Sequence, residues 1–370
     1  MDATAHTHSI DTRQARNPVE LELPAVLPTA RPELDLPGAS LFASRHYPRH
    51  ALGRVEVLLQ QLARIQTAEG EAFTGIRLDR PQVVVFAGDH GIVDERVSAF
   101  TQETSRQRVE EVLTGEATVN TLARLHGFDL TVVDAGLAQR LERPAGADER
   151  VALLPRKIGH GTRNMVLSPA MPLRQAISAI QAGMDVVRHL PGRVLALGDI
   201  GVGSTACAAL LLSRLCGVPL PDACGRDQES SGGPDSLQRQ HRLEKLQQAA
   251  ARHRKAVTPL EALAAMGGFE IAMQAGAMLQ AASERRIVLV DGFVSGAAAL
   301  VARGLRPAVA DYLVFGHRST EPGHRLLLIH MQAQPLLDME LRVGQGAGAL
   351  MAWPLLQAAQ ALLAKPMIQT

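Results

Sequence analysis

Short apolar runs alternate with longer stretches of helical spacing along most of the chain. The short runs have the length of buried strands and lie at residues 81–87, 130–134, 194–197, 287–290 and 312–315. Near-continuous aliphatic runs are typical of parallel strands that are covered on both faces. Apolar residues with helical spacing, or long runs rich in small residues, occupy residues 55–65, 106–125, 173–189, 204–215 and 259–282, with a last helix from about residue 350. This alternation predicts an α/β fold with three layers, in which helices cover a doubly wound, mostly parallel sheet.

The two ends of the chain differ from this pattern. Residues 1–40 are polar, contain several prolines and have no sustained period, so they predict a poorly ordered N-terminal arm. The folded domain is predicted over residues 41–370. Within it, residues from about 41–75 and 350–370 are expected to form a small helical satellite.

Composition narrows the partners that the chain is expected to have. A formal net charge of +1 and 3% aromatic residues argue against nucleic acid, which demands a basic excess and stacking side chains. No apolar run approaches the ~18 residues of a membrane span, and the first residues lack a secretory pattern, so a cytoplasmic protein is expected. Cys207, Cys216 and Cys224 lack CxxC spacing and predict buried thiols. The charged run over residues 239–255 predicts a solvated helix face.

Small and polar residues follow each apolar run. Asp89 and His90 follow the first run, Asp291 the fourth, and His317 and Ser319 the fifth. Because the carboxyl ends of parallel strands meet at one edge of a sheet, where α/β proteins bind their ligands, we expect these side chains to share one site.

The run at residues 194–197 leads into a glycine-rich turn. Gly201 and Gly203 lie in that turn, and Ser204 and Thr205 open the following helix, so one of them is expected to be the N-cap and to donate a hydroxyl to an anion. A strand, a glycine turn and a helix N-terminus form a common phosphate site. The spacing matches neither standard nucleotide fingerprint, so a plain βα turn and a phosphate cradle both stay open on this evidence alone.

Several residues in these clusters have more than one interpretation. For Asp89 and His90 we favour a structural, pocket-lining role over a metal or acid–base pair, because adjacent residues point apart on a strand. For His317 and His324, capping and hydrogen bonding within loops are favoured over a metal site. Asp291 could bind ribose hydroxyls or cap the next helix. In the same way, Glu270, within a helix rich in small residues, could serve packing or catalysis.

Seven blocks of sequence resemble, in the same order, the nicotinate-nucleotide–dimethylbenzimidazole phosphoribosyltransferases. They are AGDHGIVDERVSAF (87–100), GTRNMVLSPAM (161–171), LGDIGVGSTACAA (197–209), PLEALAAMGGFEIAMQAGAML (259–279), VDGFVSGAAAL (290–300), GHRSTEPGH (316–324) and LRVGQGAGA (341–349). With ALGRVE (51–56), the resemblance covers nearly all of residues 45–360.

The resemblance implies a homodimeric, Rossmann-like pentosyltransferase of cobalamin biosynthesis. It would transfer phosphoribose from nicotinate mononucleotide to a nitrogen of an aromatic base such as 5,6-dimethylbenzimidazole, giving α-ribazole 5′-phosphate and nicotinate. The resemblance implies no metal and no organic cofactor. Such an enzyme holds the 5′-phosphate, stabilises positive charge on the ribose carbon and removes the azole proton.

The chain departs from the family pattern at the residues expected to do the chemistry. The last block of the family usually reads LRLGEGTGA, and its glutamate is the expected general base; here that position is Gln345, whose amide is no base. The glutamate of the family's GEMG block is Asp199. In residues 224–240 the family's GRGTG motif is replaced, and Gln240 stands where a lysine is expected.

The resemblance and the strand-end pattern together predict three groups of site residues. The catalytic group is Gln345 and Asp199; the phosphate and ribose group is Gly201, Gly203, Ser204, Thr205 and Asp291; and the acceptor-base pocket is Asp89, His90, Phe100, Arg108, Ser319 and Val343. Three functions stay open. The first is the family reaction, performed more slowly or with Asp199 as base. The second is transfer to another acceptor such as a phenol, a purine or a different azole, and the third is a non-catalytic partner or ligand-binding subunit that pairs with an active paralogue.

Overall fold

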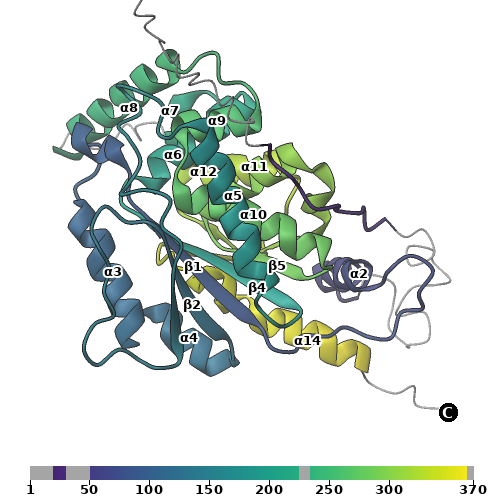
Figure 1. The fold of residues 1–370 in the computed structure, drawn as a ribbon. Coiled ribbons are helices and arrows are strands. Elements are labelled where there is room, and N and C mark those ends of the chain that lie inside the picture. Colours follow the sequence, from purple (N-terminus) through teal and green to yellow (C-terminus); the bar gives the residue numbers. More distant parts are fainter. Residues whose placement is uncertain (1–19, 31–50, 225–233, 365–370) are drawn as a thin grey trace, which may run out of the picture.

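The computed structural model describes residues 20–30, 51–224 and 234–364. A six-stranded sheet lies at its centre, every strand pair in it is parallel, and the strand order is β3-β2-β1-β4-β5-β6 (Figure 1). The strands are β1 (Gln82–Gly88), β2 (Asp129–Gly136), β3 (Val151–Pro155), β4 (Val194–Ile200), β5 (Ile287–Val290) and β6 (Leu313–Phe315). This is the strand order of the doubly wound nucleotide-binding folds. The fold class predicted from the sequence is confirmed.

The hydrophobic pattern does not predict three of the strands in the structure. In the edge strand β3 only Val151 is buried, so its sequence lacks the continuous apolar run of a covered strand. The other two are short: β7 (His317–Ser319) pairs in parallel with β8 (Leu337–Leu341) in a separate two-stranded sheet. Most residues of β8 are exposed, so burial does not impose a strand pattern on its sequence.

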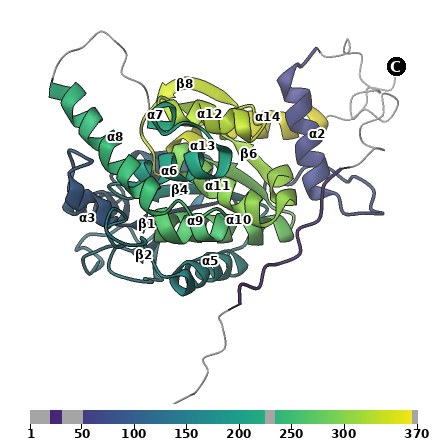
Figure 2. The same ribbon diagram turned by 90° about the horizontal axis from the view of Figure 1, so that it is seen from above.

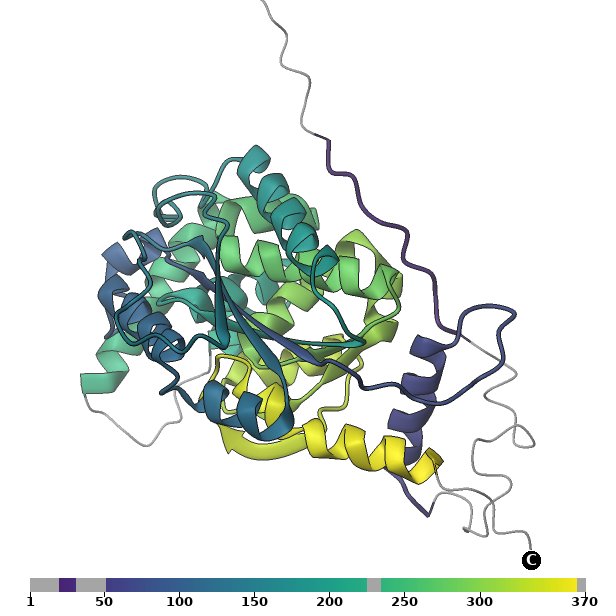
Figure 3. The same ribbon diagram turned by 60° about the horizontal axis from the view of Figure 1, so that its bottom comes forward.

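Helices cover both faces of the sheet. On one face α10 (Phe269–Ser283) contacts four strands, and α5 (Leu173–Arg188) and α11 (Phe293–Leu305) pack against it; α4 (Thr118–His126) and α13 (Ala347–Met351) contact the sheet from the other side (Figure 3). The remaining helices are α2 (Arg54–Gln66), α3 (Gln102–Thr114), α6 (Ser204–Cys216), α7 (Leu220–Cys224), α8 (Pro234–Arg252), α9 (Pro259–Met266), α12 (Pro322–His330) and α14 (Trp353–Ala364), with 3₁₀ helices η1 (Gly91–Glu95) and η2 (Pro307–Tyr312).

Two of the predicted helices are each divided in the structure. The stretch 106–125 contains the end of α3 and most of α4, because Gly115 adopts a left-handed conformation (φ 84°) that ends α3. The stretch 259–282 contains α9 and α10, with the break at Gly267 and Gly268, both extended. The apolar periodicity continues across both breaks, which is why the pattern alone joins the helices.

Helices α5 and α10 cross in direct backbone contact. A Cβ atom on Gly183 of α5 would collide with the carbonyl of Met273, and one on Gly276 of α10 would collide with the carbonyl of Ile180. The glycines at this crossing therefore allow the two helices to pack closely.

Segments from the two ends of the chain lie together. Helices α2 and α14 contact each other at one end of the molecule, and α3 and α8 lie toward the opposite end (Figure 2). Within the predicted arm, the backbone N–H of Thr29 donates to Asp311 (2.8 Å) and the hydroxyl of Tyr312 donates to the carbonyl of Leu27 (2.8 Å). The rest of the predicted arm lies outside the described residues. Within the described part of the chain no helix is long and apolar enough to cross a bilayer.

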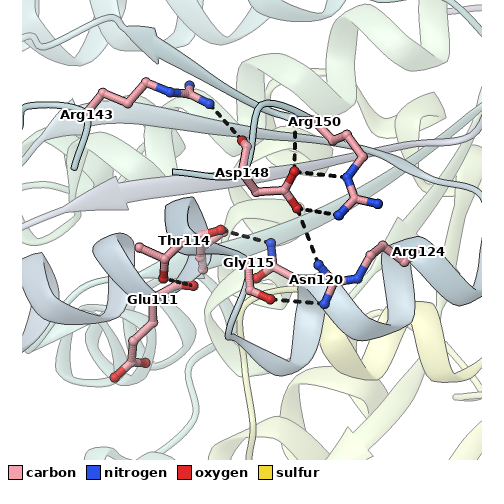
Figure 4. Close-up of polar contacts among 9 residues, drawn as sticks. Glu111, Thr114, Gly115, Asn120, Arg124, Arg143, Asp148 and Arg150 are labelled. Carbon is pink, nitrogen blue, oxygen red and sulfur yellow. Dashed lines mark hydrogen bonds and ion pairs between the residues drawn. The ribbon is translucent and has the colours of Figure 1, made fainter. Parts of the chain in front are cut away.

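A charged cluster fixes the connection between β2 and β3 (Figure 4). Asp148 pairs with Arg150 (2.9 Å) and Arg124 (3.4 Å), and Arg143 donates to its carbonyl (2.7 Å). The Arg150 guanidinium, together with the Arg150 backbone N–H, lowers the pKa of Asp148 to about 2. These contacts hold the segment between β2 and β3 in place.

Candidate functional site

A cavity of about 560 Å³ opens at the carboxyl edge of the sheet. Its walls come from the ends of β4 and β5, the start of α6, the segment from β7 to α12, and the loop between β8 and α13, with single residues from α3 and α8. All predicted site residues except Asp89 and His90 line it, namely Asp199, Gly201, Gly203, Ser204, Thr205, Asp291, Phe100, Arg108, Ser319, Val343 and Gln345.

Asp89 and His90 lie outside the cavity, in the protein interior. Asp89 Oδ2 accepts a hydrogen bond from the backbone N–H of Ala138 (2.8 Å), and burial raises the pKa of its carboxyl. His90 is fully buried, with Nε2 2.8 Å from Glu270 Oε1 and Nδ1 3.2 Å from Cys207 Sγ. The structure therefore does not place this pair in the acceptor pocket where the sequence predicted it.

The glycine turn presents its backbone to the cavity. The N-cap of α6 is Gly203, in a left-handed conformation (φ 98°), and no side chain caps this helix within the described residues, so the predicted Ser or Thr cap is wrong. Instead, Ser204 Oγ lies 3.5 Å from Asp199 Oδ2, and Thr205 Oγ1 accepts a hydrogen bond from Arg242 (3.0 Å). Without a capping side chain, the positive end of the helix dipole faces the cavity.

The loop that carries Gln345 is held against β4. Gly344, Gln345 and Gly346 all have positive φ (70°, 60° and 84°), a conformation that costs a non-glycine residue roughly 1–2 kcal/mol. The loop lies so close to β4 that a Cβ on Gly198 would collide with the backbone of Gln345. The backbone of this block therefore approaches a strand of the protein itself closely.

Asp291 fixes the same loop through its backbone. The Asp291 carboxylate accepts hydrogen bonds from the backbone N–H groups of Gly346 (3.1 Å) and Ala349 (2.9 Å), at the start of α13. Of the two roles considered for Asp291, capping is present, although at α13 and not at the next helix in the chain. Asp291 also lines the cavity beside this loop.

Asp199 and Gln345 reach the cavity from opposite faces of the sheet. Successive side chains of a strand point to opposite faces, and Gly198 faces the loop before α13. Asp199 therefore points to the face that α10 covers. Because both residues line the same cavity, a carboxyl group and a neutral amide lie on either side of the end of β4.

The surroundings of Asp199 favour its protonated form. Burial raises the pKa of this carboxyl to about 8, and the nearby acidic groups of Glu270 and Asp291 add to the effect, while His90 and Ser204 oppose it. A carboxyl with such a pKa gives up its proton around pH 8 and is a stronger base than an ordinary carboxylate once ionised.

At the far wall, Ser319 is positioned by a buried histidine. His324 Nδ1 accepts a hydrogen bond from the Ser319 backbone N–H (3.0 Å) and lies 2.9 Å from Ser319 Oγ. Burial, with His317 nearby, lowers the pKa of His324 to about 3, so the ring is neutral. His324 thus takes part in the loop hydrogen bonding expected from the sequence. His317 lines the cavity with Nε2 3.5 Å from Asp291 Oδ1.

The sequence did not single out Arg242. It lies in the charged run that predicts a solvated helix face, yet its side chain reaches Thr205 and lines the cavity. The one available signal was its position two residues after Gln240, where the family pattern places a lysine. The guanidinium of Arg108 lies over the ring of Phe100 (5.3 Å), and Arg108 lines the same cavity, so arginines from two helices line it.

Comparison with known proteins gives one consistent family. Residues 39–368 match a family model described as phosphoribosyltransferase. The chain is 46% identical over 319 residues to a nicotinate-nucleotide–dimethylbenzimidazole phosphoribosyltransferase of Cupriavidus taiwanensis, covering 85% of this chain and 88% of the relative. It is 43% identical over 316 residues to the protein of the same name from Variovorax paradoxus, covering 85% and 86%.

A solved structure supports the same likeness. The crystal structure of the nicotinate-nucleotide–dimethylbenzimidazole phosphoribosyltransferase from Thermus thermophilus superimposes with a TM-score of 0.79 at 35% sequence identity. The superposition covers 89% of this chain and 97% of that one.

Proposed function

Since the chain belongs to the nicotinate-nucleotide–dimethylbenzimidazole phosphoribosyltransferase family, we propose that it transfers phosphoribose from nicotinate mononucleotide to a benzimidazole nitrogen. The products would be α-ribazole 5′-phosphate and nicotinate, as in assembly of the cobalamin lower ligand. The observation that carries the proposal is the cavity in which an uncapped helix N-terminus, Asp199 and Gln345 lie together.

The phosphate end of the cavity is proposed at the start of α6. Backbone N–H groups of the glycine turn and the helix dipole favour an anion there. The hydroxyl of Thr205 and the guanidinium of Arg242, already hydrogen-bonded to each other, would both contact the phosphate oxygens. In this proposal Arg242 supplies the positive charge that the family's lysine, replaced here by Gln240, would supply.

The proposed chemistry exchanges one bond to the ribose carbon for another. The C1′–N bond to nicotinate breaks and its electron pair stays on the pyridine nitrogen, while a benzimidazole nitrogen forms the new C1′–N bond. The proton on the other azole nitrogen passes to the ionised carboxylate of Asp199 and then to water. Gln345, which cannot accept that proton, would hold the acceptor base by hydrogen bonding.

The reaction also requires that the site stabilise a developing positive charge. Positive charge develops on the ribose carbon as nicotinate leaves, and carboxylates nearby stabilise it. Asp291 lines the cavity beside Gln345 with its carboxylate already fixed by two backbone N–H groups, so it needs no rearrangement to act on that charge.

The protein is proposed to be a homodimer that acts in the cytoplasm. Size-exclusion chromatography with light scattering would test the dimer, and cell fractionation would test the location.

The decisive experiment gives the purified protein nicotinate mononucleotide with dimethylbenzimidazole, adenine or a phenol, and detects ribotides by mass-resolved chromatography. We expect a ribotide with dimethylbenzimidazole. A ribotide formed only with another acceptor would show that the protein is a phosphoribosyltransferase with a different acceptor substrate. Binding of nicotinate mononucleotide without any ribotide would favour the non-catalytic subunit, and absence of binding would refute the phosphoribosyl assignment.

Arg242 offers a test of the phosphate end. Arg242→Ala should raise the KM for nicotinate mononucleotide by about tenfold or more, because it removes a charge-assisted hydrogen bond, while kcat changes little. Lys245→Ala is a matched control on the same helix, since Lys245 pairs with Glu95 (2.7 Å) and does not line the cavity. An unchanged KM in the Arg242 variant would place the phosphate elsewhere.

A further inference from the structure

Behind the glycine turn lies a buried charged pair with no role in the chemistry described so far. Glu270 and His90 are both fully buried, and Nε2 of His90 is 2.8 Å from Oε1 of Glu270. Burial lowers the pKa of the imidazole, but Cys207 and Glu270 outweigh burial and hold that pKa well above its ordinary value. The protonated form of the ring is therefore favoured, and the ring faces the carboxyl group of Glu270.

This pair lies directly against the backbone of the site. A Cβ on Gly201 would lie 3.3 Å from His90 Nε2, so only the glycine turn separates the imidazole from the cavity. On the other side, a Cβ on Gly88 would lie 2.7 Å from Glu270 Oε2, and one on Gly268 would lie 2.5 Å from the same atom. The pair therefore occupies space that is free only because residues 88, 201 and 268 are glycines.

The register of the sheet puts Glu270 on the same face as Asp199. Phe86 of β1 pairs with Asp199 of β4, and Gly88, two residues later, shares that face. Glu270 lies against Gly88 in the first turn of α10, the helix that covers this face. Asp199 and Glu270 therefore lie on the same face of the sheet, and of the two only Asp199 lines the cavity.

Packing alone does not account for Glu270. Its Oε2 atom has no hydrogen-bond partner among the described residues. A buried, unsatisfied carboxylate oxygen is costly, and an apolar side chain of similar volume would fill the space without that cost. Buried charges retained beside a cleft are candidates for tuning its chemistry.

We propose that Glu270 is a positioning residue for the transfer reaction: held in place by His90 behind the glycine turn, its carboxylate sets the proton affinity of Asp199. The inference rests on the proposed function of Asp199 as the base. Gln345 is unable to accept a proton, and burial together with the negative charge of Glu270 makes Asp199 a stronger base than an exposed aspartate. Asp291 after β5 and His90 after β1 also face Asp199, and Arg108 and Arg242 line its cavity.

The test is the pH dependence of kcat in Glu270→Gln. Removing the negative charge should move the acid limb of the profile to lower pH by roughly one unit, which raises the ionised fraction of Asp199 up to about tenfold below the limb. The plateau rate should fall, because a less basic carboxylate accepts the proton less readily. An acid limb at the wild-type pH would overturn the proposal.

A matched variant separates this effect from lost packing. Gln274, one turn later on α10, is also fully buried, and Ser295 donates a hydrogen bond to it (2.7 Å). Gln274→Met should lower stability and leave the acid limb in place; a limb that moves as far as in Glu270→Gln would show a structural effect only. If Glu270→Gln fails to fold, the double variant His90→Gln with Glu270→Gln replaces the pair by two neutral amides and should move the limb in the same direction but less far, because His90 opposes Glu270 at Asp199.

A second readout does not depend on turnover. Difference infrared spectra between wild type and Asp199→Asn, with isotope-labelled aspartate, follow the carbonyl band of protonated Asp199 as pH rises. That band should disappear at lower pH in the Glu270→Gln background. If wild type forms no ribotide, the proposed function fails while this titration still decides the role of Glu270. Ribotide formation with an unmoved band would refute the inference alone.

Discussion

Asp199 lies where one face of β4 meets the cavity, and burial beside Glu270 and Asp291 raises its pKa to about 8. Below that pH its carboxyl is protonated and cannot accept the azole proton, so kcat should rise with pH and level off above about 8. Measured at saturating substrates, the rate at pH 7 should be about one tenth of the plateau. Asp199→Asn should lower the plateau by roughly 10²–10⁴-fold. A wild-type rate independent of pH between 6.5 and 8.5 would exclude Asp199 as the base.

Gln345 is the second residue whose identity sets the rate. Gln345→Glu changes one atom group without changing the left-handed backbone, and it puts a carboxylate on the opposite face of β4 from Asp199. Its turnover with dimethylbenzimidazole should exceed that of wild type by roughly 10²-fold or more, and the rise with pH should begin at lower pH. Gln345→Met, which is neutral and of similar size, is the control. A rate for Gln345→Glu no higher than for wild type would mean that the proton has another acceptor.

The residues that sequence predicted best are those at the ends of covered strands. Asp199, Asp291 and Ser319 share one cavity because parallel strands bring their carboxyl ends to one edge. The structure places Asp89 outside that cavity because it bonds to the loop after β2, and the pairing of Glu270 with His90 depends on how the start of α10 meets β1. No spacing in the sequence encodes either contact.

At the scale of elements, the loop before α13 depends on one carboxylate. Asp291→Ala would leave the N–H groups of Gly346 and Ala349 without their acceptor, at a cost of about 1–3 kcal/mol for each buried group. Hydrogen exchange of residues 344–351 should become faster, with little change in α5 or α10. Asp291→Asn keeps one acceptor oxygen and should show a smaller increase. Exchange unchanged in Asp291→Ala would mean that packing on Gly198 suffices to hold the loop.

The crossing of α5 and α10 is the element contact least tolerant of added volume. Gly276→Ala would put a methyl group into the carbonyl of Ile180, and relieving that clash should cost roughly 1–3 kcal/mol of unfolding free energy. Urea unfolding would measure the loss, with Ser283→Ala at the end of α10 as a control expected to stay within about 0.5 kcal/mol of wild type. A Gly276→Ala variant as stable as wild type would show that the two helices can separate freely.

The helix boundaries show where an element-scale prediction from sequence ends. The apolar pattern located α2, α5 and α6 closely, because α2 and α5 each bury one apolar face and α6 is a continuous apolar run that is buried on all sides. It joined α3 to α4 across Gly115, where a single left-handed residue turns the chain without interrupting the apolar spacing. The apolar pattern also did not predict β3, because an edge strand with mostly exposed side chains has no continuous apolar run.

At the scale of the whole molecule, the proposed base should weaken the fold that carries it. The pKa of Asp199 is about 8 in the folded protein and near 3.8 in the unfolded chain, so the folded state binds more protons between these values. Stability should therefore fall as pH rises from about 4 to 8, with the full penalty present above pH 8. Asp199→Asn lacks this titration. Its unfolding free energy relative to wild type should increase with pH, by at most about 1.4 kcal/mol per pH unit.

Urea unfolding of both proteins at several values between pH 5 and 8 would measure this difference, and it requires no substrate. Gln345→Met is a suitable control, because it alters a non-titrating residue of the same cavity and should differ from wild type by a constant amount. A constant difference for Asp199→Asn as well would mean that the carboxyl is already ionised at pH 5. In that case neither the proposed base nor its tuning by Glu270 would stand, whereas a rising difference would show that the molecule gives up stability to keep a proton acceptor in its active site.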